Sequence, residues 1–149
     1  MTLKQTILTA TLATAVLAAT PAQADPLSTA EECLGPVAAV GFFLSESPHY
    51  EMDGLTGRKA RIAFAALVDI IVNEKYGSVP GDARWQNLKG AVSDRTSTSP
   101  AARDAYIHIK RNIRRDGHPF AGDDDLRQTL SRCLKFAYEK RLVIQGLSQ

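Results

Sequence analysis

A charged stripe in the second half of the chain has the clearest spacing for chemistry. Its members recur every three or four residues, which places them on one face of a helix. They are Asp104, His108, Arg111 and Arg115, flanked by Lys110 and Arg114. Such a basic face can bind a lipid headgroup, an anionic cell-wall polymer or an acidic protein patch. The same spacing is typical of a plain solvent-exposed face with an Asp104–His108 pair, and we favour that interpretation.

Asp104 and His108 also have the residue types of a catalytic orienter and base. That chemistry needs a nucleophile or a held water within hydrogen-bond reach. The chain has no Gly-x-Ser-x-Gly motif to supply one, and an exposed helix face does not exclude water. The sequence therefore predicts no catalytic residue.

Metal ligation is not indicated either. The three histidines, His49, His108 and His118, form no His-x-x-x-His pair, and Cys-x-x-Cys is absent. The Asp123–Asp125 run lacks the alternating spacing of a calcium loop and suits the positive end of a helix dipole. We predict neither a metal nor a cofactor.

Asp69 is the only polar residue between Ile62 and Val72. A buried carboxylate there would need a partner or a raised pKa, both of which are frequent at functional sites. Helical spacing places it on the side of Arg58 and Asn73, away from the most apolar stripe. We therefore expect Asp69 to face solvent or to form a salt bridge.

The first 24 residues have the pattern of a secretory signal peptide. Lys4 supplies the positive start, residues 7–19 the apolar segment, and Ala22-Gln23-Ala24 the small-x-small cleavage site. Residues 25–149 then form one exported domain without a membrane anchor. Once Lys4 is removed, the 18 basic and 16 acidic residues leave a net charge of about +1, which does not indicate nucleic acid as a partner.

Two cysteines, Cys33 and Cys133, lie in this domain. In an oxidising compartment an isolated pair is most simply one disulfide. The closed loop of roughly 100 residues would contribute about 4–5 kcal/mol of stability. Such a bond would join the first helix to the last.

Hydrophobic periodicity predicts an all-α domain, a small bundle of four to five helices. We expect helices at residues 28–44, 56–76, 82–94, 100–116 and 123–145. Ser28 and Glu31 resemble a capping box, and Pro36 should kink or split the first helix. Ser99 is the expected N-cap of the fourth helix, with Pro100 in its first position, and Gly77, Gly117 and Gly146 follow three helix ends.

The second helix is so apolar that we expect it at the centre of the bundle, or in a dimer interface if the monomer leaves it uncovered. Its deepest stripe should be Ala60, Phe64, Leu67, Val68 and Ile71. Other core positions are Cys33, Val37, Val40 and Leu44 in the first helix, Ala102, Tyr106, Ile109 and Ile113 in the fourth, and Leu126, Leu130, Cys133, Ala137 and Ile144 in the last. Phe42 and Phe43 cannot both point inward, so we expect one of them either to lie under the following loop or to be an exposed anchor for a partner.

These features predict a small periplasmic or secreted accessory protein that acts without catalysis through a protein–protein surface. The partner would be another envelope protein. One alternative is a binder of anionic lipid or polymer that uses the Lys110–Arg115 cluster. The other is a small hydrolase or lyase whose site would involve Asp69, Asp104 and His108.

Overall fold

The computed structural model of the chain describes residues 24–146, and side chains as far as Arg141. Over these residues the chain forms five α-helices and no strand, apart from an isolated bridge between Met52 and Leu55. The helices are α1 (Pro26–Glu46), α2 (Gly57–Tyr76), α3 (Trp85–Ser97), α4 (Pro100–Asp116) and α5 (Asp124–Gly146). The predicted all-α bundle is confirmed. The predicted leader lies outside the described residues except for Ala24, and so does the side chain of Ile144.

The helix ends follow from local hydrogen bonds. Thr56 and Ser99 accept the backbone N–H of the residue three positions later and cap α2 and α4. The cap at Ser99 was predicted, whereas Thr56 was expected as the first residue of its helix. Gly77 and Gly117 end the same helices with φ of 61° and 71°, a left-handed conformation that glycine adopts without strain. Asp123 caps α5 through a 3.2 Å bond from the Leu126 amide.

Two predicted helix starts are wrong. Helix α1 begins at Pro26 because the Asp25 carboxylate accepts the Ser28 amide at 3.0 Å, so the Ser28 capping box is not used. Helix α3 begins at Trp85 rather than at residue 82. There the Asp82 carboxylate accepts the Val79 amide at 2.9 Å and the Ser78 hydroxyl at 3.0 Å, and this turn occupies the residues before the helix. These bonds, that of Val79 first, lower the pKa of Asp82.

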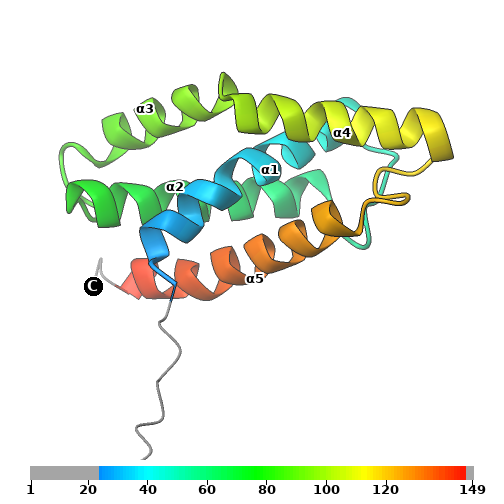
Figure 1. The fold of residues 1–149 in the computed structure, drawn as a ribbon. Helices are drawn as coiled ribbons and strands as arrows, with labels where there is room; N and C mark the ends of the chain where they lie inside the picture. Colours follow the sequence, from blue (N-terminus) through cyan, green and yellow to red (C-terminus); the bar gives the residue numbers. More distant parts are fainter. Residues whose placement is uncertain (1–23, 147–149) are drawn as a thin grey trace, which may run out of the picture.

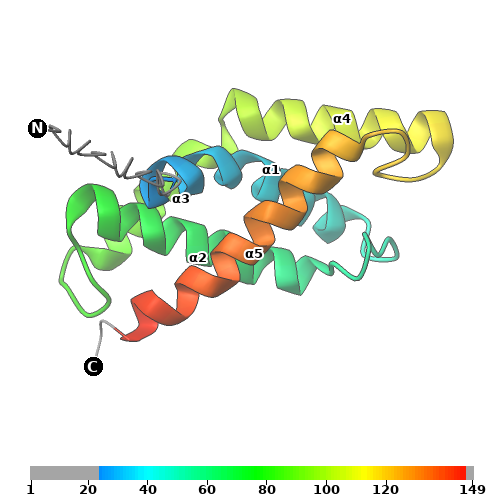
Figure 2. The same cartoon turned by 60° about the horizontal axis from the view of Figure 1, so that its bottom comes forward.

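Helix α1 is the centre of the bundle. It packs against all four other helices, whereas α2 packs against α1, α3 and α5. Figure 1 shows α1 between α3 and α4 on one side and α5 on the other, and Figure 2 shows α5 crossing over α1 and α2. The prediction that α2 is the central helix is therefore wrong. Pro36 was expected to kink or split α1. The helix is not split and continues through Pro36 as one element.

Helix α1 is also the one described helix long and apolar enough to cross a membrane by length and composition. Half of its apolar window is buried inside the bundle, as in the core helix of a folded domain. The predicted inward face of α1 is confirmed, since Cys33, Val37, Val40 and Leu44 are all buried.

The predicted disulfide is present. Cys33 and Cys133 are fully buried, and their Cα atoms lie 5.3 Å apart, so the bond ties α1 to α5 inside the core. A disulfide indicates that the protein folds in a non-reducing environment, as extracytoplasmic proteins do.

Helices α1 and α4 approach most closely at Gly35. A methyl group on this residue would lie 2.8 Å from the Ala101 Cβ and 3.0 Å from the Ala102 amide nitrogen. Contacts this short are repulsive, so only glycine lets α4 pack here.

Replacing both cysteines by alanine should lower the free energy of unfolding by about 4 kcal/mol, because the bond closes a loop of 100 residues in the unfolded chain. Urea unfolding of the oxidised protein and the double variant measures this difference. A loss below about 1 kcal/mol would contradict it.

Gly35→Ala should destabilise the protein by about 1–3 kcal/mol, because α4 must move to make room. Gly90→Ala is the matched control, since it lies within α3 with open space around it. That variant should gain up to about 1 kcal/mol from helix propensity. Equal effects of the two substitutions on thermal unfolding would refute the close approach of α1 and α4.

Candidate functional site: an apolar groove beside the central helix

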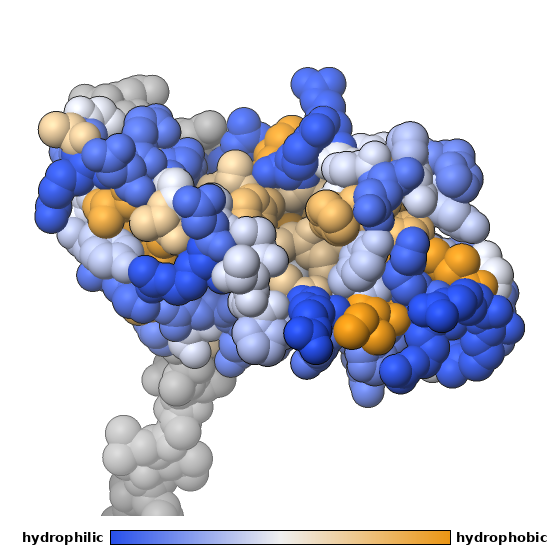
Figure 3. All heavy atoms as spheres, turned by 90° about the horizontal axis from the view of Figure 1, so that it is seen from above, coloured by the Kyte–Doolittle hydropathy of each residue, from blue (hydrophilic) through white to orange (hydrophobic). Residues whose placement is uncertain are grey.

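An apolar groove of about 510 Å³ opens between α1, α2 and the start of α4. Figure 3 looks onto this side of the molecule and shows apolar side chains gathered in a hollow with hydrophilic residues around it. We call this surface the apolar groove. Its residues are Val37, Ala38, Ala39, Gly41, Phe42 and Ser45 of α1, Ala60, Arg61 and Phe64 of α2, Ser97 and Thr98, and Ala102, Arg103 and Tyr106 of α4.

The apolar groove exists because small residues face one another across it. Ala38, Gly41, Ala60 and Ala102 contribute at most a methyl group each, so the space above them stays open. A methyl group added to Gly41 would stand 3.6 Å from the Ala60 Cβ, an ordinary contact distance. The groove can therefore be partly filled by substitution without forcing the helices apart.

Aromatic side chains form its walls. Phe42 is 58% exposed and packs edge-on against Tyr106, with ring centroids 5.4 Å apart, whereas Phe43 is 1% exposed. The expectation that only one of the two phenylalanines points inward is confirmed. Phe64 was expected in the deepest stripe of α2, but it is only partly buried and lines the groove.

Tyr106 is held in place by Glu46. Its hydroxyl donates a hydrogen bond to the Glu46 carboxylate, and Lys110 Nζ lies 5.6 Å from the centre of its ring. The hydrogen bond to Glu46, followed by partial desolvation and the carboxylate charge, raises the pKa of Tyr106 above its ordinary value. The bond joins α1 to α4 at the groove wall.

Two arginines stand at the edges of the apolar groove. Arg61 comes from α2 and Arg103 from α4, and both are exposed. Neither forms a salt bridge with any described residue. Their guanidinium groups are free to bind an anion beside the apolar surface.

A second hollow adjoins the apolar groove. It has a volume of about 500 Å³ and shares Ser45 and Arg61 with the groove. We call it the polar hollow. Its other residues are Leu44, Pro48, His49, Tyr50, Glu51, Thr56, Gly57 and Arg58.

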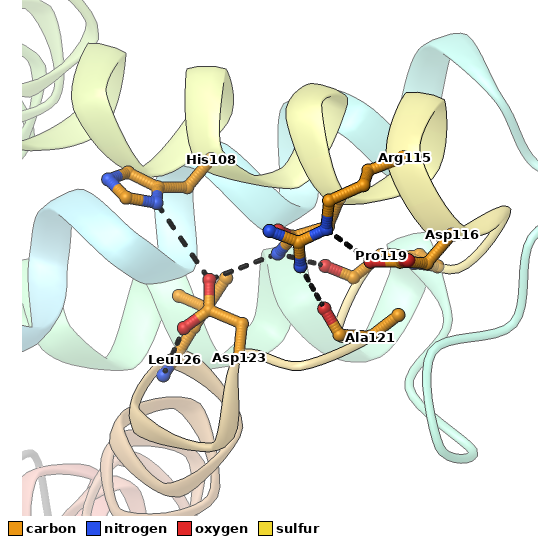
Figure 4. Close-up of polar contacts among 8 residues, drawn as sticks. His108, Arg115, Asp116, Pro119, Ala121, Asp123 and Leu126 are labelled. Atoms are coloured by element: carbon orange, nitrogen blue, oxygen red, sulfur yellow. Dashed lines mark hydrogen bonds and ion pairs between the residues drawn. The ribbon is translucent and has the colours of Figure 1, made fainter.

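The charged stripe predicted on α4 faces solvent, but much of it is engaged in the turn before α5 (Figure 4). Arg115 Nε lies 2.5 Å from the Asp116 carboxylate, and its Nη2 donates to the Ala121 carbonyl at 2.9 Å. Arg114 Nε donates to the Lys110 carbonyl at 3.4 Å. No salt bridge or side-chain hydrogen bond engages Arg111 within the described residues.

His108 faces Asp123 rather than Asp104. Its Nδ1 lies 3.8 Å from Asp123 Oδ2, and the same oxygen accepts a bond from the Asn112 side chain at 3.0 Å. Asn112 is almost fully buried and also donates to the Pro119 carbonyl at 2.8 Å. The arrangement holds the α4–α5 connection. Asn112 lies one helical turn after His108, beside the charged stripe, and no sequence motif marks it.

The structure does not bring Asp69, Asp104 and His108 together. Asp69 pairs with Lys89 of α3 at 2.7 Å, with about a quarter of each side chain exposed. This agrees with the expected salt-bridged position. Among the described residues, no group of three histidine, cysteine or acidic side chains is arranged to hold a metal.

Comparison of the chain with protein-family models, with curated proteins and with solved structures found no match. The apolar groove is therefore defined as the candidate site by its own geometry. The sequence predicted that one of Phe42 and Phe43 would lie under the following loop or be an exposed anchor. Five other groove residues were predicted as core positions: Val37, Ala60, Phe64, Ala102 and Tyr106. The groove residues lie on four helices and at Thr98, and no local pattern reveals how these elements are placed relative to one another.

Glu46→Gln should lower the pKa of Tyr106 toward its ordinary value, because the charged acceptor is lost. Tyrosine ionisation is followed by ultraviolet absorbance as the pH is raised. The titration that is missing in Tyr106→Phe belongs to Tyr106. Since the folded-state pKa is raised, the interaction stabilises the fold below about pH 10 and is lost as the pH rises through the raised value. A Tyr106 titration that Glu46→Gln leaves unchanged would contradict the bond.

Proposed function

We propose that this protein is a small extracytoplasmic binding protein that works without catalysis and holds the apolar chain of an amphiphilic molecule in the apolar groove. The observation that carries the proposal is the groove itself, with the exposed Phe42 ring at its edge. Large exposed apolar surfaces on a folded domain mark binding sites, because they are costly to leave in water.

Two features support an extracytoplasmic compartment. The disulfide between Cys33 and Cys133 requires a non-reducing environment. The leader pattern of residues 1–24 provides a route of export. We propose the periplasm as the location.

The dimensions of the apolar groove favour a single chain as its occupant. A volume of about 510 Å³ falls within the range of about 300–1,000 Å³ that is typical of small-molecule sites. Three helices supply its walls, and the disulfide fixes one of them to the rest of the bundle, so the site is largely preformed. An envelope protein that inserts an apolar side chain is the competing occupant, and the experiment below separates the two.

The basic cluster on α4 supports an anion-binding function less well. Arg115 is bound to Asp116 and to the Ala121 carbonyl, and Lys110 packs over the Tyr106 ring. Two of the four basic residues between Lys110 and Arg115 are therefore already engaged in contacts within the protein. A catalytic function has no support from Asp69, Asp104 and His108, since Asp69 pairs with Lys89 and His108 with Asp123.

The uncharged probe N-phenyl-1-naphthylamine, which fluoresces in apolar surroundings, tests the groove. The protein should bind it, and Ala38→Phe should weaken binding at least about tenfold because the new ring occupies the groove, a loss of about 1.4 kcal/mol. Ala91→Phe, on the exposed face of α3, is the matched control and should bind as the unmodified protein does.

Circular dichroism should show that both variants keep the fold. Absence of probe binding, or equal binding by the two variants, would refute the proposal. Organic extraction of the protein purified from its native compartment, followed by mass spectrometry, should release an amphiphile. If no amphiphile is extracted and crosslinking joins residues of the apolar groove near Phe42 to an envelope protein, the occupant is a protein.

A further inference from the structure

The polar hollow lies directly against one end of the apolar groove. Ser45 and Arg61 line both, so the two spaces adjoin at these residues. The Ser45 hydroxyl donates to the Gly41 carbonyl at 2.8 Å, so its oxygen can still accept a hydrogen bond from another donor. Arg61 is the charged residue of this shared pair. A molecule with an apolar chain in the groove would therefore place its polar end beside Arg61.

The charges around the polar hollow are mainly positive. Arg58 and Arg61 of α2 line it, and Glu51 is the one acidic residue among its lining residues. No salt bridge engages either arginine within the described part of the chain. Both guanidinium groups therefore keep their full hydrogen-bonding capacity.

Nearby carboxylates are engaged elsewhere. Asp53 lies 3.3 Å from Arg127 Nε, and Glu46 accepts the Tyr106 hydroxyl. Glu46 keeps its negative charge when it accepts this neutral hydroxyl, but it does not line the polar hollow, where two arginines are opposed by Glu51 alone. Arginine presents a planar fork of donors that matches the oxygens of a carboxylate or a phosphate.

From this juxtaposition we propose that the occupant of the apolar groove is a single-chain amphiphile with an anionic head. Its alkyl chain lies between Phe42, Phe64 and Tyr106, and its carboxylate or phosphate binds Arg61 and Arg58 in the polar hollow. This inference rests on the proposed function and adds the chemistry of the head. A fatty acid and a lysophospholipid share that chemistry.

Calorimetric titration with matched twelve-carbon ligands tests the head. Dodecanoate and dodecyl phosphate should bind about tenfold more tightly than the uncharged monododecanoylglycerol, and dodecyltrimethylammonium should bind more weakly still. All ligands are kept below their micelle-forming concentrations. A preference for dodecanoate indicates a fatty acid, and a preference for dodecyl phosphate indicates a phosphorylated lipid.

The double variant Arg58→Gln/Arg61→Gln should lose about tenfold in affinity for dodecanoate and keep its affinity for monododecanoylglycerol and for N-phenyl-1-naphthylamine. Arg111→Gln/Arg114→Gln is the control, because it removes the same charge from the stripe on α4. That control should bind every ligand as the unmodified protein does. It also tests whether the α4 stripe contributes.

Equal affinity of the unmodified protein for anionic and uncharged ligands would overturn the inference and leave the proposed function intact. An equal loss in both double variants would overturn it as well, since the effect would then reflect net charge. Binding of inorganic phosphate as tight as that of dodecyl phosphate would show an anion site independent of the groove. Failure of N-phenyl-1-naphthylamine to bind would instead refute the proposed function.

Discussion

The packing of α1 against every other helix is the constraint on which the rest of the structure depends. A helix surrounded on this scale must present small residues where its neighbours come close, and Gly35 meets α4 with no space for a side chain. The Cys33–Cys133 bond then fixes α1 to α5, although 100 residues separate the two cysteines in the chain. The remaining helices take their positions relative to this fixed pair.

The apolar groove is a consequence of the same packing. Small residues that let helices approach closely on one side of α1 also continue along its surface to Ala38 and Gly41, where no helix covers them. Aromatic rings close the sides but do not fill the space, because Tyr106 is held toward Glu46 and Phe42 remains largely exposed. A site built on packed helices needs little rearrangement to receive a chain, which reduces the entropic cost of binding.

Electrostatics separates the two basic surfaces of the molecule. The stripe on α4 has the more regular sequence pattern, yet Arg115 is bound within the turn before α5. Arg58 and Arg61 belong to no sequence motif, yet they lie beside an apolar space and have no carboxylate partner among the described residues. A cation contributes to recognition when its surroundings are apolar and its own donors are free, and neither condition can be read from periodicity.

The sequence by itself determined the all-α class, the cap at Ser99, the glycine ends of α2 and α4, and the pairing of Cys33 with Cys133. Caps depend on residues three or four positions apart, and a single cysteine pair in an oxidising compartment allows only one bond. Only the tertiary structure decided that α1 rather than α2 is central, that Phe64 lines a groove, and that His108 faces Asp123 instead of Asp104. These outcomes depend on how helices cross and which side chains fit between them, and such contacts join residues far apart in the chain, beyond the reach of local patterns.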